Sequence, residues 1–110
     1  DEDGALVCVG EIGSNTSLNI LQGHVEKLIS NAADAANLAK IDDASDVFIS
    51  DCISRILYLE DEFHLELEAV KSSLPDQAGL EGILSIGEVS SGVNGYLEFY
   101  NKTIVIASFY

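Results

Sequence analysis

The sequence contains few basic residues and no long hydrophobic run. Five Lys and Arg face nineteen Asp and Glu, which gives a net charge of -14. Such a surface repels the phosphates of nucleic acids and anionic membranes, so we expect no binding to nucleic acid. The longest apolar runs, such as residues 104–107, are a few residues long, whereas spanning a bilayer takes roughly 20. We therefore predict no transmembrane segment.

The sequence also lacks the motifs that carry catalysis or hold a cofactor. Its glycines form neither a dinucleotide-binding nor a Walker A loop, and the acids near residues 1–3 and 42–46 do not have EF-hand spacing. His24 and His64 lie on different segments, and no Ser or Cys is placed by the sequence to act with them. We predict no catalytic, cofactor-binding or metal-binding residue, and we do not expect an enzyme. A small enzyme that uses His64 is the third hypothesis, after the two given below.

Cysteine is scarce and methionine is absent. Cys8 and Cys52 have apolar neighbours, which is typical of buried free thiols; a single disulfide between them is the alternative. A chain that starts at Asp1 without methionine is a processed product or reflects a cloning boundary. Two N-glycosylation sequons start at Asn15 and Asn101, but about one is expected by chance. The compartment therefore stays open between a secreted and a cytoplasmic protein.

What the sequence does contain is enough apolar surface for one core. The chain has 110 residues, of which 47% are hydrophobic, so we expect a single compact domain over residues 1–110. Residues 4–12 form a short run rich in Val, which indicates a buried strand. Residues 16–40 have apolar side chains at alternating steps of three and four, which predicts a long helix. The positions of that stripe are Leu18, Leu21, Val25, Leu28, Ala32, Ala35 and Ala39.

Residues 53–75 fit either a helix or a hairpin. A hairpin would turn at Glu60, Asp61 and Glu62, where no Gly, Asn or Pro supplies the backbone angles that a tight turn requires. A helix over 44–74 places nine apolar residues on one stripe, and Pro75 stops it. We therefore predict the helix. Those nine residues are Ile49, Cys52, Ile53, Ile56, Leu59, Phe63, Leu67, Val70 and Leu74.

After Pro75 the chain is rich in glycine and in β-forming residues. We predict strands at 82–89, 95–100 and 103–109, with the last two joined by a tight hairpin at Asn101 and Lys102. Residues 7–14 resemble residues 84–91 in their order of apolar, small, Gly and Glu residues. This similarity indicates either a duplicated strand and turn or, as we prefer, the general likeness of strands that end in Gly-Ser turns.

The predicted architecture is α+β. Two long helices, 16–40 and 44–74, pack with a small antiparallel sheet made of the N-terminal strand and the three C-terminal strands. The alternative is one helix on a larger antiparallel sheet, which would apply if residues 53–74 formed a hairpin.

The favoured functional hypothesis is a non-enzymatic protein-interaction or self-assembly module with a strongly acidic surface, and we expect a homo-oligomer. The alternative is an acidic inhibitor or immunity-type protein that neutralises a basic protein, because nine of the nineteen acids lie between Asp42 and Glu68. The candidate interaction residues are apolar positions off the main stripe, the acidic run, and the aromatic residues near the C-terminus. They are Phe48, Leu57, Tyr58, Glu60, Asp61, Glu62, Tyr96, Phe99, Tyr100, Phe109 and Tyr110.

Overall fold

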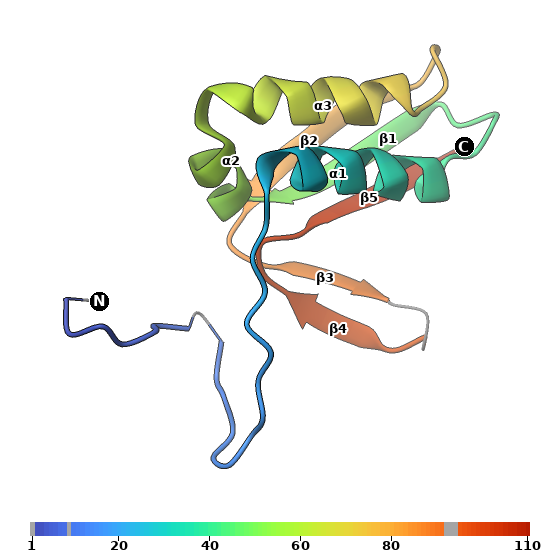
Figure 1. Cartoon of the computed structure of the whole chain (residues 1–110). Helices are drawn as coiled ribbons and strands as arrows, with labels where there is room; N and C mark the ends of the chain where they lie inside the picture. The colour runs from blue at the N-terminus through green and yellow to red at the C-terminus, as the bar shows by residue number, and fades with distance from the viewer. Residues whose placement is uncertain (1, 9, 92–94) are drawn as a thin grey trace.

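The computed structural model describes residues 2–8, 10–91 and 95–110. Two helical segments cover one face of a small sheet, and an N-terminal arm, residues 2–24, leaves the body from the start of the first helix (Figure 1). The α+β class predicted from the sequence is confirmed.

A three-stranded mixed sheet forms the centre of the molecule. Strand β1 (Asp46–Cys52) lies between β2 (Gly79–Ser85), which is parallel to it, and β5 (Ile104–Phe109), which is antiparallel. Parallel neighbours need a long crossover, and the helical residues between β1 and β2 provide it. Strands β3 (Glu88–Ser91) and β4 (Leu97–Tyr100) pair with each other in a separate two-stranded antiparallel sheet.

The helices pack on one face of this sheet. Helix α1 (Val25–Ala39) lies beside α3 (Phe63–Ser72), which follows α2 (Ile53–Leu59) and the 3-10 turn η1 (Glu60–Glu62). Together they bury a core in which small alanines on α1 allow close approach to the sheet. The core consists of Ala32, Ala36, Val47, Ile49, Val70 and Leu74, with Ala78, Leu80, Ile104 and Ile106 packed at its edge.

The helical interpretation of the stretch after residue 53 is confirmed, and the hairpin alternative is wrong. The helix is nevertheless interrupted, because Glu60 has φ 49° and ψ -120°, and its backbone N–H bonds to the carbonyl of Ile56. The chain changes direction at this residue before α3 begins.

The predicted start of that helix is wrong, because residues 46–52 form β1. Val47, Ile49 and Asp51 alternate with less buried residues, and the strand is hydrogen-bonded on both sides. Pairing with two strands distant in the sequence outweighs the helical stripe to which Ile49 and Cys52 also belong.

The N-terminal predictions also need correction. The described residues of the predicted strand 4–12 form no strand, and the predicted helix 16–40 begins only at Val25. Helices of this length draw most of their stability from packing, but Leu18 and Leu21 have no neighbouring surface and are 60% and 90% exposed. Gly23, just before α1, further disfavours a longer helix.

The C-terminal strands occur near their predicted positions but pair differently. The predicted strand 82–89 is broken at Ile86 and Gly87 into the end of β2 and the start of β3. The predicted hairpin at Asn101 and Lys102 is wrong, because β4 pairs with β3 while β5 pairs with β1. The sheet is therefore mixed, and the four predicted strands do not form one antiparallel sheet.

Candidate functional site

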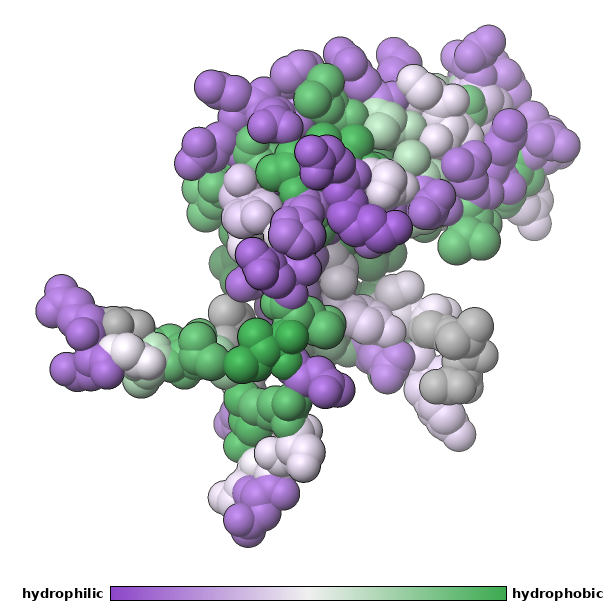
Figure 2. All heavy atoms as spheres, viewed as in Figure 1, coloured by the Kyte–Doolittle hydropathy of each residue, from purple (hydrophilic) through white to green (hydrophobic). Residues whose placement is uncertain are grey.

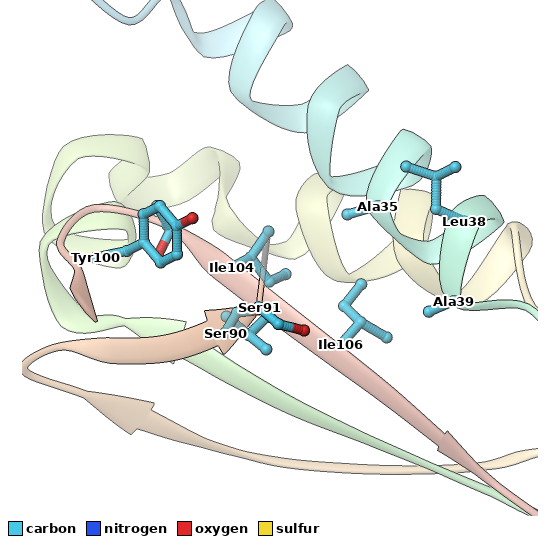
Figure 3. Close-up of a pocket in the computed structure, with 10 residues that line it drawn as sticks. Ala35, Leu38, Ala39, Ser90, Ser91, Tyr100, Ile104 and Ile106 are labelled. Atoms are coloured by element: carbon cyan, nitrogen blue, oxygen red, sulfur yellow. The ribbon is translucent and has the colours of Figure 1, made fainter. Parts of the chain in front are cut away.

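A groove of about 440 Å³ lies between α1 and β5. We call it the α1–β5 groove (Figure 3). Helix α1 and strand β5 form its walls, and the β3–β4 hairpin adds one side. Its lining residues are Ala35, Leu38, Ala39, Ser90, Ser91, Tyr100, Thr103, Ile104, Val105 and Ile106.

The lining of the groove is apolar with a few hydroxyl groups. Among the described residues that form it, none carries a charge, although the chain as a whole has a net charge of -14. Leu38, one of the lining residues, is 89% exposed. Tyr100 donates a 2.6 Å hydrogen bond to Glu98, whose carboxylate raises the pKa of the tyrosine hydroxyl. The groove can therefore hold an uncharged apolar segment but offers no acid–base pair.

Strand β5 gives this groove an open sheet edge. It pairs with β1 on one side and is the last strand of its sheet on the other. Ser108 fixes β5 to α1 through a 2.6 Å hydrogen bond to the carbonyl of Ala39. An extended peptide can add to such an edge through backbone hydrogen bonds, with its side chains in the neighbouring groove.

A buried ionic cluster centred on Arg55 connects elements that surround the groove. Arg55 donates from Nε to Glu66 at 3.3 Å and also bonds Glu66 through Nη2. Nη2 also donates to the carbonyl of Leu28 at 3.2 Å, and Nη1 donates to the carbonyl of Lys102 at 3.4 Å. Arg55 therefore ties α1, α3 and the β4–β5 connection to α2.

Glu88 extends this cluster to the β3–β4 hairpin. Its carboxylate accepts hydrogen bonds from Ser85 at 2.6 Å and from the hydroxyl of Thr103 at 2.8 Å. Glu88 is 1% exposed and is the first residue of β3, while Thr103 lines the groove just before β5. These bonds determine where β3 lies relative to β5.

Asp51 is the unsatisfied member of the cluster. It is 2% exposed, and neither carboxylate oxygen has a hydrogen-bond partner in the described part of the chain, although Arg55 Nε lies 3.4 Å from Oδ1. Burial, and next the charge of Glu66, raises the pKa of Asp51 to about 7. Glu88 acts in the same direction, and Arg55 opposes them. Arg55 thus lies within ion-pair distance of two buried carboxyl groups, Asp51 and Glu66, while Glu88 is held by hydrogen bonds from Ser85 and Thr103.

Sequence reasoning did not find this cluster. From the sequence, Glu66 is one of the nine acids between Asp42 and Glu68, and no role is predicted for Arg55. The available signal was the presence of charged residues inside apolar stretches, with Arg55 directly before Ile56 and Glu66 between Leu65 and Leu67.

The structure distributes the predicted interaction residues over several elements. Phe48 and Phe109 line a small hollow of about 190 Å³ on the sheet. Of the predicted residues, Tyr100 alone lines the α1–β5 groove, and it lies with Tyr96 and Phe99 in or beside β4. Leu57 and Tyr58 are exposed on α2, the three acids Glu60, Asp61 and Glu62 are exposed on η1, and Tyr110 is 91% exposed. These residues therefore do not make one continuous site.

The arm adds apolar surface that no element covers. Leu6, Val7, Leu18, Ile20 and Leu21 are between 60% and 90% exposed. Figure 2 shows hydrophobic residues gathered along the arm, whereas hydrophilic residues cover much of the helical layer.

The cysteines are both free. Cys52 is buried as expected, but Cys8 is exposed because the arm that carries it does not pack on the sheet.

Within the described residues, no group of three or more metal-ligating side chains is placed to hold an ion. The described helices are also too short or too polar to span a membrane.

Comparison with known proteins identifies a family for this chain. No curated protein and no solved structure is significantly similar to the chain. The family model described as FIST C domain matches residues 1–91, which is most of the chain and includes α1, α3, β1 and β2. The chain therefore belongs to the FIST C domain family.

Proposed function

We propose that this chain is a non-enzymatic protein-interaction module that associates with copies of itself through uncharged apolar surface. The observation that supports this most strongly is the α1–β5 groove, an uncharged hollow beside an open sheet edge in a chain of net charge -14. Two copies repel each other over most of their surface. Their contact is therefore expected where charge is absent.

The family context agrees with an interaction role. The FIST C domain is associated with signal transduction, a setting in which domains commonly act by binding other proteins. The geometry adds that the groove offers an edge strand and apolar side chains, which are the features used for binding extended peptides.

The acidic turn supports a second candidate function. Glu60, Asp61 and Glu62 are exposed on η1, and the ion pairs of the described residues involve none of them. A basic protein could bind there, and its association would be accelerated by the field of the chain. This acidic inhibitor or immunity-type function differs from self-association in its dependence on salt.

Light scattering coupled to size exclusion, at low and at high salt, tests the proposal. Self-association through uncharged surface should give an oligomer at low and at high salt. The affinity between copies should be greater at high salt, because screening weakens their repulsion. A monomer under both conditions would contradict self-association. The second candidate would be favoured instead if the chain binds a basic protein at low salt. This binding should disappear at high salt, and it should also disappear when Glu60, Asp61 and Glu62 are made neutral.

A further inference from the structure

The longest uncharged stretch of the sequence is also one of the most exposed parts of the structure. Residues 12–23 contain no Asp, Glu, Lys, Arg or His. Within them Leu18, Ile20 and Leu21 are 60%, 83% and 90% exposed. Residues 16–22 are extended and have no hydrogen bond to any other described residue. Such a segment is ready to pair as a strand but has no partner within its own copy.

The α1–β5 groove has the complementary properties. It is uncharged, it is lined by apolar residues such as Leu38 and Ile106, and it runs beside the open edge of β5. β5 contains six residues, Ile104–Phe109, which is close to the length of residues 16–22. Copies that carry the same net charge of -14 can approach most closely where both surfaces lack charge.

We propose that residues 16–22 of one copy add as a strand to β5 in the groove of a second copy, and that the exchange is reciprocal. This inference rests on the proposed self-association and specifies its contact. Reciprocal exchange closes a two-fold dimer and leaves neither groove open. Each copy gives seven residues and receives seven, and the flanking apolar residues Leu6, Val7 and Ile12 extend the contact toward the roughly 20–30 residues per side of a standard interface.

The start of α1 explains why the partner is a second copy and not the same chain. The hydroxyl of Tyr58 donates a 2.9 Å hydrogen bond to the carbonyl of Gly23, which fixes the point where the arm leaves the body. From there the arm runs away from the sheet (Figure 1). The groove lies at Ala35 to Ala39, about 15 Å or more along α1 from its start. To reach it, the arm of the same copy would have to reverse at Gly23 and give up this bond.

Two variants and their mixture test the exchange. Ile20→Pro removes a backbone N–H from the arm and is expected to weaken the dimer about tenfold or more, because proline cannot pair within a sheet. Leu38→Glu places a charge in the groove and should weaken it similarly. Matched controls are Gly10→Pro, which is in the arm but outside both residues 16–22 and the flanking apolar residues, and Ser30→Glu, which adds the same charge to an exposed position of α1. Both controls should stay dimeric, and circular dichroism should show the same helix content in all variants.

Mixing the two defective variants is the decisive step. Ile20→Pro keeps an intact groove and Leu38→Glu keeps an intact arm, so a mixture should form a one-to-one complex at concentrations where each variant alone is mostly monomeric. A wild-type monomer in light scattering would contradict the proposed self-association itself. A wild-type dimer that persists in both variants would overturn the exchange while leaving self-association intact. Loss of the dimer in both variants without rescue in the mixture would place the arm in the groove of its own copy, which also overturns the proposal.

Discussion

Arg55 is a buried cation whose side chain bonds to α1, to α3 and to the connection between β4 and β5. It is 5% exposed and lies among Asp51, Glu66 and Glu88, each of which is at most 2% exposed. A buried cation without its carboxylates, or carboxylates without their cation, costs several kcal/mol because the remaining charge has lost its water. The cluster therefore specifies the arrangement of α1, α2, α3 and β3 more than it adds to the net free energy of folding.

Replacing Arg55 by Met should destabilise the chain by about 3–5 kcal/mol, because Glu66 would stay buried without a cation. Urea unfolding at neutral pH measures this change. Lys71→Met is the matched control, since it removes the same charge from an exposed position and should change the free energy of unfolding by less than about 0.5 kcal/mol. Equal effects of the two substitutions would mean that the Arg55 cluster has no structural role.

Asp51 makes stability depend on pH. Because the pKa of Asp51 is raised to about 7 in the folded chain from 3.8, the folded state binds one more proton than the unfolded state between these pH values. The free energy of unfolding should therefore fall as pH rises through this range, by at most about 1.4 kcal/mol per pH unit. Well above pH 7, Asp51 is deprotonated in both the folded and the unfolded chain, so its contribution to the free energy of unfolding no longer changes with pH.

Asp51→Asn should remove this dependence. Urea unfolding of both proteins at pH 5 and pH 7 should show the variant gaining about 2 kcal/mol relative to the wild type between the two values. The other carboxylates titrate in both proteins, so their effect on the free energy of unfolding cancels in the difference between variant and wild type. A difference between variant and wild type that is the same at both pH values would show that Asp51 titrates normally.

At the scale of elements, the break between α2 and α3 is the main source of backbone strain. Glu60 has φ 49° and ψ -120°, a combination that glycine adopts freely and that costs other residues about 1–3 kcal/mol. The chain accepts this cost because the bend lets α2 carry Arg55 toward Glu66 on α3.

Glu60→Gly should raise the free energy of unfolding by about 1 kcal/mol, since it relieves the strain but adds entropy to the unfolded chain. Thermal unfolding measures the change. The control is Glu62→Gly, which removes the same charge from the same turn. Glu62 has φ -88° and ψ -3°, which residues with a side chain adopt without strain, so glycine relieves nothing there and should lower stability by about 0.5–1 kcal/mol. A loss of stability in both variants would contradict the strain at Glu60.

Elements whose stability is local could be predicted from the sequence, and those that depend on distant partners could not. The stripe from Ile53 to Val70 has enough helical turns to exclude the hairpin. Residues 46–52 satisfy a helical stripe and a strand alternation at once, and only pairing with residues 79–85 and 104–109 decides between them. Likewise, Leu18 and Leu21 continue the stripe of α1, but the fold places no surface beside them.

The candidate groove was beyond prediction for the same reason. Its walls come from α1, β3 and β5, and their positions depend on bonds such as Thr103 to Glu88 and Ser108 to Ala39. The sequence did indicate an apolar surface left over after one core is packed, and it indicated aromatic residues near the C-terminus. It did not indicate that the arm would be the most exposed apolar segment.

At the scale of the whole molecule, charge and apolar surface are separated. Nine of the nineteen acids lie between Asp42 and Glu68, on the loop before β1 and on the elements that run from β1 to α3. The arm from residue 12 to residue 23 and the α1–β5 groove carry no charge. In the proposed self-association, the acidic part of the chain repels other copies and the uncharged part contacts them. The central claim is that association covers the arm and the groove.

Hydrogen–deuterium exchange of the whole wild-type chain, at concentrations above and below its dissociation constant, tests this claim most directly. We predict that the amides of residues 16–22, and those amides of β5 that do not bond to β1, are protected at the high concentration and exchange freely on dilution, while those of α3 exchange equally slowly at both. Rapid exchange of residues 16–22 at every concentration would contradict the account, because the arm would then remain uncovered even where the chains associate.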